Sequence, residues 1–309
     1  MVTVGVDVGG TKVLGVAVDA TGIVVAEHRV PTPAGQAAVL GAVCAMVEAL
    51  GPADGVGVGA PGLVDRRGAL RVAANLPGVG DLDLLGALAA RYPDRRIRVD
   101  NDATCAAWAE HGVGAARGVD DAVLVTLGTG IGGGIITGGR LARGASGFAG
   151  EVGHMVVDPH GPPCPCGKRG CWERMASGRG LGRLGREAAE AGRGARLVAL
   201  AGGDPGAVRG EHVTEAAADG DAEAGAVMDA FAWWVALGLA NLTEILDTEL
   251  FVLGGGLADA GEILLAPTRA AFAGLVQGAE LRRVRIVVAE LGERAGAIGA
   301  ALLAAADDG

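Results

Sequence analysis

The sequence predicts an α/β protein made of two similar halves. Short apolar strands alternate with helical segments, an order typical of sheets that are covered by helices on both faces. Each half opens with a strand, a glycine-rich turn and a return strand, at residues 4–18 and again at residues 122–137. This repeat indicates an internal duplication, and we expect such halves to face each other across a cleft.

The elements of each half follow from the spacing of apolar residues. In the first half we predict strands at 4–8, 13–18, 23–30, 55–58 and 97–99, and helices at 34–50, 83–92 and 102–111. In the second half we predict strands at 122–127, 135–137, 250–253 and 284–289, and helices at 178–191, 221–246 and 296–306. We expect a first domain at 1–114 and a second at 115–294, with the final helix, about 295–306, packing back onto the first.

Composition excludes several classes of protein. The chain has 309 residues, half of them hydrophobic, and a net charge of −10, which disfavours nucleic acid and anionic membranes as partners. The first residues lack the basic start of a signal peptide, and the longest apolar runs are shorter than the roughly 20 residues of a membrane span. We therefore expect a cytoplasmic protein, in which clustered cysteines bind metal more often than they form disulfides.

Three glycine-rich turns follow apolar strands. The first contains Asp7, Gly9, Gly10, Thr11 and Lys12. It is not the nucleotide-binding P-loop, because the threonine precedes the lysine and a strand follows instead of a helix. We interpret it as a tight hairpin whose amides and threonine hydroxyl meet phosphate oxygens, with the aspartate near a metal ion.

The second turn contains Gly128, Thr129, Gly130, Gly132 and Gly133. It satisfies the dinucleotide pattern G-x-G-x-x-G, but no helix follows, so we reject NAD binding and keep phosphate binding by backbone amides.

The third turn, formed by Gly254, Gly255 and Gly256, lies between a strand and a predicted helix, where ribose or adenine can approach the backbone. Each turn alone is equally consistent with a plain hairpin. Three such turns in duplicated halves favour a nucleotide cleft.

Asp102 is the candidate catalytic carboxylate. It follows a predicted strand and begins a helix, and an enzyme that phosphorylates an alcohol needs one carboxylate to orient the hydroxyl and accept its proton. The alternative is that Asp100, Asn101 and Asp102 only cap the helix, which this stretch alone favours. A cap does not need all three residues, however, so one of them is available for chemistry.

A cysteine cluster predicts a metal site. Cys164, Cys166 and Cys171 have the spacing C-x-C-x4-C, and zinc readily takes thiolate and imidazole ligands. Unliganded thiols in such a cluster would oxidise easily. His154 and His160 are the candidates for a fourth ligand.

His154 is the better candidate if it shares one site with Glu151. Its second ring nitrogen would then orient a substrate hydroxyl while the metal fixes the ring. Glu173 flanks the cluster on the other side. Cys44 and Cys105 lie in predicted helices and are interpreted as core residues.

Together these motifs resemble the ROK family of sugar kinases and sugar-responsive repressors, most of all its zinc-containing glucokinases. The resemblance runs nearly end to end and rests on residues 7–12, 101–103, 128–134, 151–154, 164–173 and 254–256. It implies an actin-like and hexokinase-like fold, with ATP and Mg²⁺ in the cleft and a structural Zn²⁺. Members are often dimers or tetramers, so a homodimer or homotetramer is expected.

The resemblance also implies roles for individual residues. Asp102 would act as the base that deprotonates the sugar 6-hydroxyl. The sugar would be held by Asn75, Asn101, Asp102, Glu151, His154 and Glu173. Zinc would be held by His154, Cys164, Cys166 and Cys171. The phosphates would lie in the turns at 9–12 and 128–134.

One departure from the family pattern lies beside the base. The family usually has Glu-Asn-Asp-x-Asn-Ala, whereas this chain has Asp100 at the first position and Thr104 at the fifth. The base is retained, so the departure bears on fine positioning and not on activity.

The leading functional hypothesis is ATP-dependent phosphorylation of the 6-hydroxyl of a hexose, converting glucose to glucose 6-phosphate for glycolysis. N-acetylglucosamine and N-acetylmannosamine kinases share the same motifs, and polyphosphate stays open as a donor. A sugar-responsive transcriptional regulator is disfavoured, because the family's repressors carry a DNA-binding module before the first glycine motif, and here Asp7 follows Met1 closely.

Overall fold

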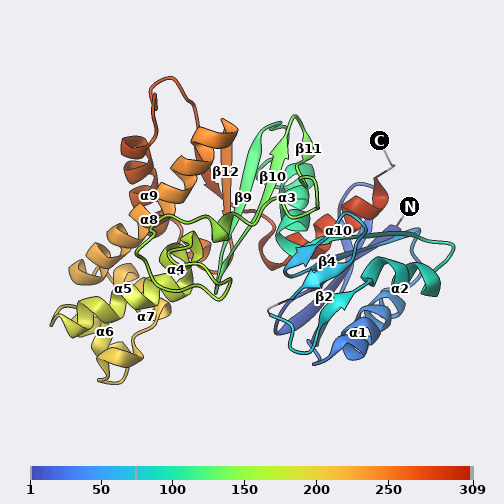
Figure 1. The fold of residues 1–309 in the computed structure, drawn as a ribbon, viewed down its shortest axis with the longest axis horizontal. Coiled ribbons are helices and arrows are strands. Elements are labelled where there is room, and N and C mark those ends of the chain that lie inside the picture. Colours follow the sequence, from blue (N-terminus) through green and yellow to red (C-terminus); the bar gives the residue numbers. More distant parts are fainter. Residues whose placement is uncertain (1, 74, 307–309) are drawn as a thin grey trace. The chain divides into compact units, whose positions relative to one another are not determined.

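The computed structural model describes residues 2–73 and 75–306 (Figure 1). The chain divides into two compact units. Unit 1 comprises Met1–Leu124, Gly133–Gly150 and Glu290–Gly309, and unit 2 comprises Val125–Gly132 and Glu151–Ala289. The domain limits expected from the sequence, at residues 114 and 294, remain predictions.

Unit 1 is built on a five-stranded sheet with the order β3-β2-β1-β4-β8. Its strands are β1 (Val2–Val8), β2 (Lys12–Asp19), β3 (Val24–Pro31), β4 (Gly55–Ala60) and β8 (Arg96–Asn101). The first three strands form an antiparallel meander, whereas β4 and β8 run parallel to β1. The predicted strands of this half are all present.

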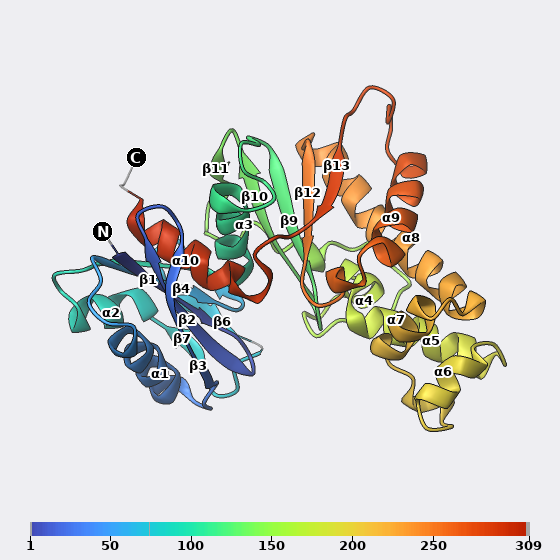
Figure 2. The same ribbon diagram turned by 180° about the vertical axis from the view of Figure 1, so that it is seen from behind.

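Helices cover both faces of this sheet (Figure 2). One face packs against α1 (Gln36–Ala49) and α2 (Leu84–Arg91), through residues that include Val13 and Ala17 of β2. The opposite face packs against α10 (Ala295–Ala305), through Leu14 and Val16. This alternation is the period of two expected of a strand that is buried on both sides.

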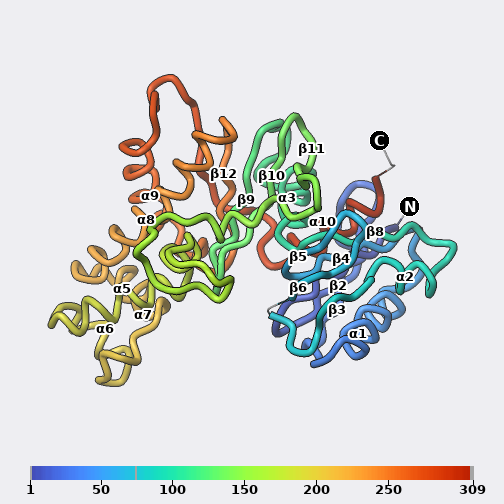
Figure 3. The backbone as a smooth tube through the Cα atoms, in the orientation of Figure 1, coloured from blue at the N-terminus to red at the C-terminus, as the bar shows by residue number. Residues whose placement is uncertain are grey.

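The C-terminal helix α10 packs between the sheet and α3 (Asp102–Val113), and Figure 3 shows its red trace beside the blue first strands. Glycines make this close packing possible. A Cβ on Gly5 would lie 1.9 Å from the Ala297 carbonyl oxygen, and a Cβ on Gly57 would lie 1.8 Å from that of Ala300. The apolar run at the end of the sequence is therefore a helix of the unit 1 core.

A second sheet has the order β11-β10-β9-β12-β13. Its strands are β9 (Ala122–Leu127), β10 (Ile131–Thr137), β11 (Arg140–Leu141), β12 (Leu250–Gly254) and β13 (Arg285–Val288). As in the first sheet, an antiparallel hairpin is followed by parallel strands. The common order supports the predicted duplication.

The structure corrects the predicted elements in three places. Strand β10 begins at Ile131, so the glycines at 132–134 lie in a strand and not in a turn. A small sheet of β5 (Leu63–Val64), β6 (Leu70–Val72) and β7 (Gly80–Leu82) was not predicted, because strands this short leave no apolar run. Helices α4 (Trp172–Ala176), α6 (Ala195–Leu200) and α7 (Gly210–Ala218) are also additional.

The core of unit 2 is organised by the long helix α8 (Ala222–Leu246), which packs against α4, α5 (Gly178–Glu190), α7 and α9 (Glu262–Leu275). By length and composition α8 is the one helix in the described part of the chain that could cross a membrane, but 56% of its apolar window is buried. Trp172 is fully buried against it and donates a hydrogen bond from Nε1 to the Trp234 carbonyl at 2.7 Å.

Gly238 of α8 provides a test of this core. A Cβ at Gly238 would lie 1.9 Å from Cε2 of the Trp172 ring, and a fully buried ring has little room to move. We expect Gly238→Ala to lower the free energy of unfolding by about 1–3 kcal/mol, as overpacking does. Gly225→Ala in the same helix meets open space and should be neutral or stabilising by up to about 1 kcal/mol. Equal effects of the two variants in chemical denaturation would contradict this packing.

Candidate functional site

Asn101, and not Asp102, is the N-cap of α3. The Asn101 Oδ1 atom accepts a hydrogen bond from the Thr104 amide at 3.0 Å. Its Nδ2 atom donates to the Gly62 carbonyl at 3.1 Å and to Asp102 Oδ1 at 2.9 Å. The cap is therefore complete without Asp102, which is the first residue of the helix, where the helix dipole favours an ionised carboxylate.

Asp7 lies on β1, near Asp102, and is electrostatically strained. The residue is partly exposed, but its Oδ1 atom is buried and has no hydrogen-bond partner among the described residues. Burial and the charge of Asp102 raise the pKa of Asp7 to about 7, and the charge of Lys12 only partly offsets this. An oxygen of this kind is suited to a cation or to a ligand that carries one.

Asp100 supports the capping residue. Its side chain is buried and accepts a hydrogen bond from the Asn101 amide at 2.9 Å. Its other oxygen pairs with Nε of Arg143 at 2.6 Å. Asp100 and Thr104, the two positions that depart from the family pattern, are thus both part of the cap. Sequence reasoning missed Arg143, which lies 43 residues along the chain.

The first glycine turn is a closed hairpin in unit 1. The Gly9 amide donates to the Lys12 carbonyl at 2.8 Å, and the Thr32 hydroxyl donates to the Gly9 carbonyl at 2.6 Å. Asn75 lies against this turn, since a Cβ on Gly10 would be 3.1 Å from its carbonyl oxygen. The side chain of Lys12 forms an ion pair with Glu293.

The second and third turns lie together in unit 2. The Gly128 amide donates to the Gly130 carbonyl at 3.0 Å, and the Leu257 amide donates to the Leu127 carbonyl at 3.0 Å. Gly255 has a φ of +81° and packs on Leu127, where a Cβ would lie 2.6 Å from the carbonyl oxygen. Only glycine fits this position, because both the space and the backbone conformation exclude a side chain.

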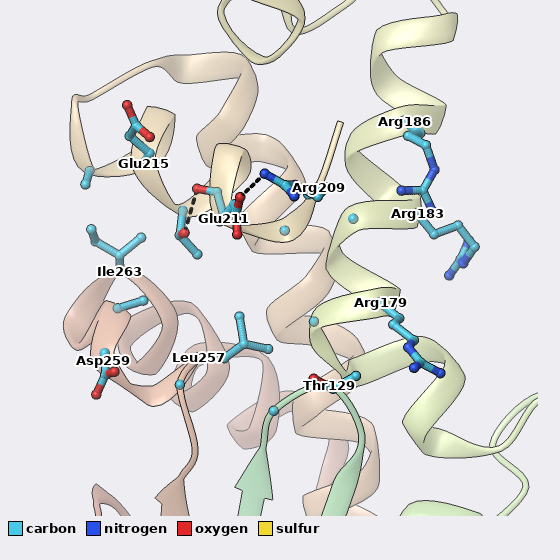
Figure 4. Close-up of a pocket in the computed structure, with 18 of the residues that line it drawn as sticks. Thr129, Arg179, Arg183, Arg186, Arg209, Glu211, Glu215, Leu257, Asp259 and Ile263 are labelled. Carbon is cyan, nitrogen blue, oxygen red and sulfur yellow. Dashed lines mark hydrogen bonds and ion pairs between the residues drawn. The ribbon is translucent and has the colours of Figure 1, made fainter. Parts of the chain in front are cut away.

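These two turns border a cavity of about 1050 Å³ (Figure 4). Thr129, Gly256 and Leu257 line one part of it. The basic lining residues are Arg174, Arg179, Arg183, Arg186 and Arg209. Figure 4 shows three of these arginines on α5 and the acidic Glu211 and Glu215 on α7. Arg179, Arg183 and Arg186 of α5 form an arginine row that was not predicted, although their spacing of i, i+4 and i+7 places them on one face of a helix.

Glu173 stabilises the second turn. Its Oε2 atom accepts a hydrogen bond from the Ile131 amide at 3.0 Å. A Cβ on Gly130 would lie 2.4 Å from the same oxygen, so this glycine leaves room for the carboxylate. Gly132 also belongs to the network, because its amide donates to the Thr126 hydroxyl at 3.1 Å. Glu173 thus connects the second glycine turn to the segment that contains the three cysteines.

Glu151 is the N-cap and His154 the last residue of the short 3-10 helix η1 (Val152–His154), and their Oε2 and Nε2 atoms are 3.8 Å apart. Burial raises the pKa of Glu151, the nearby His154 lowers it, and the charge of Glu173 raises it again. The structure therefore gathers three predicted sugar ligands, Glu151, His154 and Glu173, in unit 2. The other three, Asn75, Asn101 and Asp102, lie in unit 1.

The cysteine cluster has the geometry of a metal centre. One donor atom from each of His154, Cys164, Cys166 and Cys171 lies within 4.8 Å of the other three. The Cys166 and Cys171 sulfurs are 3.5 Å apart, and Cys164 Sγ lies 3.8 Å from His154 Nδ1. A tetrahedron with Zn–S distances of about 2.3 Å has edges of about 3.8 Å. His160 is not part of the group.

The donor set also fits a cation by its chemistry. Cys164 and Cys171 are buried, and burial together with the adjoining thiols raises the pKa of Cys171 to about 12. Three thiols this close favour a bound cation that stabilises the thiolates. Cys44 and Cys105 lie in α1 and α3, and Cys105 is fully buried, as the sequence predicted.

Comparison with known proteins agrees with this geometry. The family model described as ROK family matches residues 3–307. A glucokinase of Streptomyces coelicolor is 39% identical over 313 residues, which cover 99% of this chain and 98% of that protein. An N-acetylmannosamine kinase of Escherichia coli is 34% identical over 312 residues, with 98% of each chain covered.

A solved structure is also similar. The crystal structure of a ROK family glucokinase from Streptomyces griseus, in complex with glucose and AMPPNP, superposes with a TM-score of 0.85 at 40% identity. The match covers 98% of this chain and 99% of that one. The predicted actin-like and hexokinase-like fold is thereby confirmed. The chain belongs to the ROK family.

Proposed function

We propose that this chain is an ATP-dependent glucose kinase that phosphorylates the 6-hydroxyl of glucose. The similarity to a Streptomyces glucokinase and to a glucokinase structure with glucose and AMPPNP supports the substrate pair. The observation that carries the proposal is the state of Asp102. Asn101 caps the helix, and the Asp102 carboxylate stands in the first turn, where its Oδ1 atom accepts hydrogen bonds from the Asn101 side-chain amide and the Ala103 N–H.

In the proposed reaction Asp102 accepts the proton of the sugar 6-hydroxyl as that oxygen bonds to the γ-phosphorus. The bond between the γ-phosphorus and the bridging oxygen to the β-phosphate breaks, and ADP leaves with the electron pair. A base of low pKa suffices, because the proton moves late, when the oxygen already bonds to phosphorus. The Asn101 amide and the Ala103 N–H both donate to Asp102 Oδ1 and orient the carboxylate.

The phosphoryl donor would lie along the glycine turns. The Thr129 backbone amide suits phosphate oxygens, whereas the Gly128 amide already donates to the Gly130 carbonyl. Gly256 lines the cavity and has open space at its Cβ position, which allows ribose or adenine to approach the backbone. Arginines of α5 add positive charge to the same cavity. Mg²⁺, when bound, offsets the negative charge of the phosphates, and Asp7 is the residue that would hold it, because its buried Oδ1 has no described partner.

The zinc site would have a structural role. With three thiolates and the His154 Nδ1 atom as ligands, the metal site is closed to substrate. The imidazole would then be fixed with Nε2 on the side of Glu151, 3.8 Å from its carboxylate. A fixed imidazole and two nearby carboxylates, Glu151 and Glu173, provide the hydrogen-bonding groups that a sugar ring needs.

A coupled assay over sugars and donors tests the proposal. We expect phosphorylation of glucose with ATP to have a higher kcat/KM than that of mannose, fructose, N-acetylglucosamine or N-acetylmannosamine. The relative named N-acetylmannosamine kinase makes that sugar the main rival, and a preference for it would overturn the glucose assignment. A parallel series with polyphosphate in place of ATP measures which phosphoryl donor the cavity beside the α5 arginines accepts.

Asp102→Asn tests the base. The amide keeps the shape of the side chain but cannot accept the proton, so kcat should fall about 10²- to 10⁴-fold. The dissociation constant for glucose should change less than about threefold, and the melting temperature should stay near that of the wild type, because the amide oxygen can still accept from the Ala103 N–H. A kcat within a factor of ten of the wild type would contradict the assignment.

Cys166→Ala tests the metal centre. We expect the variant to lose zinc, measured by elemental analysis, and to raise the KM for glucose by about 10- to 100-fold, because the metal no longer fixes His154. Cys44→Ala, in helix α1 outside the cluster, is the matched control and should keep both zinc and KM. A zinc-free Cys166→Ala enzyme with the wild-type KM for glucose would contradict the claim that the metal positions His154 for sugar binding.

Asp7→Asn tests the cost of the strained carboxylate. The unfolded chain releases this proton near 3.8 and the folded chain near 7, so the free energy of unfolding should fall as the pH rises between these values. The variant should therefore be more stable than the wild type at pH 8, by about 1–3 kcal/mol, and similar to it near pH 4.5. Its kinase activity should be much lower.

Asp94→Asn, at an exposed carboxylate, is the control for this experiment and should keep the kinase activity of the wild type. Equal stability of Asp7→Asn and wild type at pH 8, measured by chemical denaturation, would show that Asp7 is not strained.

A further inference from the structure

The first turn of α10 lies directly against the Asp7 carboxyl group. Gly296 is the second residue of this helix. A Cβ at Gly296 would lie 2.8 Å from both Cγ and Oδ2 of Asp7, and 3.1 Å from Oδ1. Real Cβ atoms essentially never lie within 3.0 Å of another heavy atom, as this one would of Cγ and Oδ2. Any side chain at position 296 would therefore displace either the helix or the carboxyl group.

Hydrogen bonds and ion pairs at the N-terminal end of α10 prevent the helix from moving away from Asp7. Glu110 is 1% exposed, and its Oε1 and Oε2 atoms accept hydrogen bonds from the Leu291 amide at 2.9 Å and the Glu290 amide at 3.2 Å. In the next turn, Glu293 pairs with Lys12 and with Arg29. These contacts fasten the segment that leads into α10 to the rest of unit 1.

The helix is also confined on its two sides. A Cβ on Gly299 would lie 1.7 Å from the Cys105 carbonyl oxygen of α3, and a Cβ on Gly5 would lie 1.9 Å from the Ala297 carbonyl oxygen. Backbone atoms of α3 and of β1 thus lie directly against the two sides of α10. A methyl group at position 296 would therefore act mainly on the Asp7 carboxyl, because this group ends a side chain whereas the other close neighbours of the helix are backbone atoms.

We propose that Gly296 is a positioning residue for the kinase reaction: its missing side chain lets the Asp7 carboxyl occupy the place beside Asp102 that the donor phosphates and their cation require. The inference rests on the proposed function and adds to it a residue 289 positions away from Asp7. The alternative is that Gly296 serves only the packing of α10, as Gly5 and Gly299 do.

A double-mutant cycle separates these two roles. Gly296→Ala is made in the wild type and in the Asp7→Ala background, in which the colliding carboxyl is absent. Gly41→Ala is the matched control, since this glycine lies in α1 of the same unit and meets open space. For each protein the kcat and the KM values for Mg·ATP and glucose are measured, together with the free energy of unfolding.

We expect Gly296→Ala to lower kcat/KM for Mg·ATP at least tenfold, with the KM for glucose changed less than twofold. In the Asp7→Ala background the same substitution should change kcat/KM for Mg·ATP less than twofold. The loss of stability caused by Gly296→Ala should also shrink in that background. Gly41→Ala should leave the kinetic constants near the wild-type values and should leave the free energy of unfolding unchanged or higher.

An equal fold-loss in both backgrounds would overturn the proposal, because Gly296 would then act independently of Asp7. A rise in the KM for glucose that parallels the loss with Mg·ATP would overturn it as well. If Gly296→Ala alone fails to fold, recovery of folding in Asp7→Ala/Gly296→Ala supports the contact, and failure to recover contradicts it. A wild-type protein without glucose kinase activity would contradict the proposed function, while the unfolding measurements would still decide the coupling.

Discussion

The packing of α10 between a sheet and a helix is the constraint on which unit 1 depends. Backbone meets backbone on both sides of this helix, at Gly5 and Gly57 of the sheet and at Gly299 of the helix itself. Such contacts cannot be relieved by a change of rotamer, so the helix fixes the strand that carries Asp7 relative to the helix that begins at Asp102. The spacing of the two carboxylates is thus a property of the core and not of a surface loop.

At Asp7 this arrangement lowers the free energy of unfolding at neutral pH, and the same carboxyl group is the one that the proposed reaction requires. A carboxyl group whose pKa is raised to about 7 by burial and by a second carboxylate is poorly solvated at neutral pH. Other charged groups of unit 1, such as Glu110 and the Asp100–Arg143 pair, are hydrogen-bonded or ion-paired. A cation and phosphates would compensate for the strain at Asp7. Perturbed carboxyl groups of this kind gather at functional sites.

Much of the fold could be read from the sequence, because strands and turns are local patterns. The repeat of strand, glycine turn and strand predicted both sheets, and the cysteine spacing predicted a donor set that the structure brings within 4.8 Å. Contacts between distant residues could not be predicted in this way. Nothing in the local sequence relates Arg143 to Asp100, or Gly296 to Asp7, since both contacts depend on how the chain returns to the sheet. The arginine row of α5 does have a local signal, because its like charges recur at helical spacing.

The pKa of Asp7 in the ligand-free protein tests the account most directly. Carbon-13 NMR of the labelled carboxyl carbons, with Asp7→Asn used to assign the resonance, gives this value. The account predicts a midpoint of about 7, and a lower midpoint in Asp102→Asn, where the neighbouring negative charge is removed. A midpoint near 3.8 in the wild type would mean that Asp7 is solvated and independent of Asp102, and it would contradict the carboxylate arrangement from which the proposed mechanism is built.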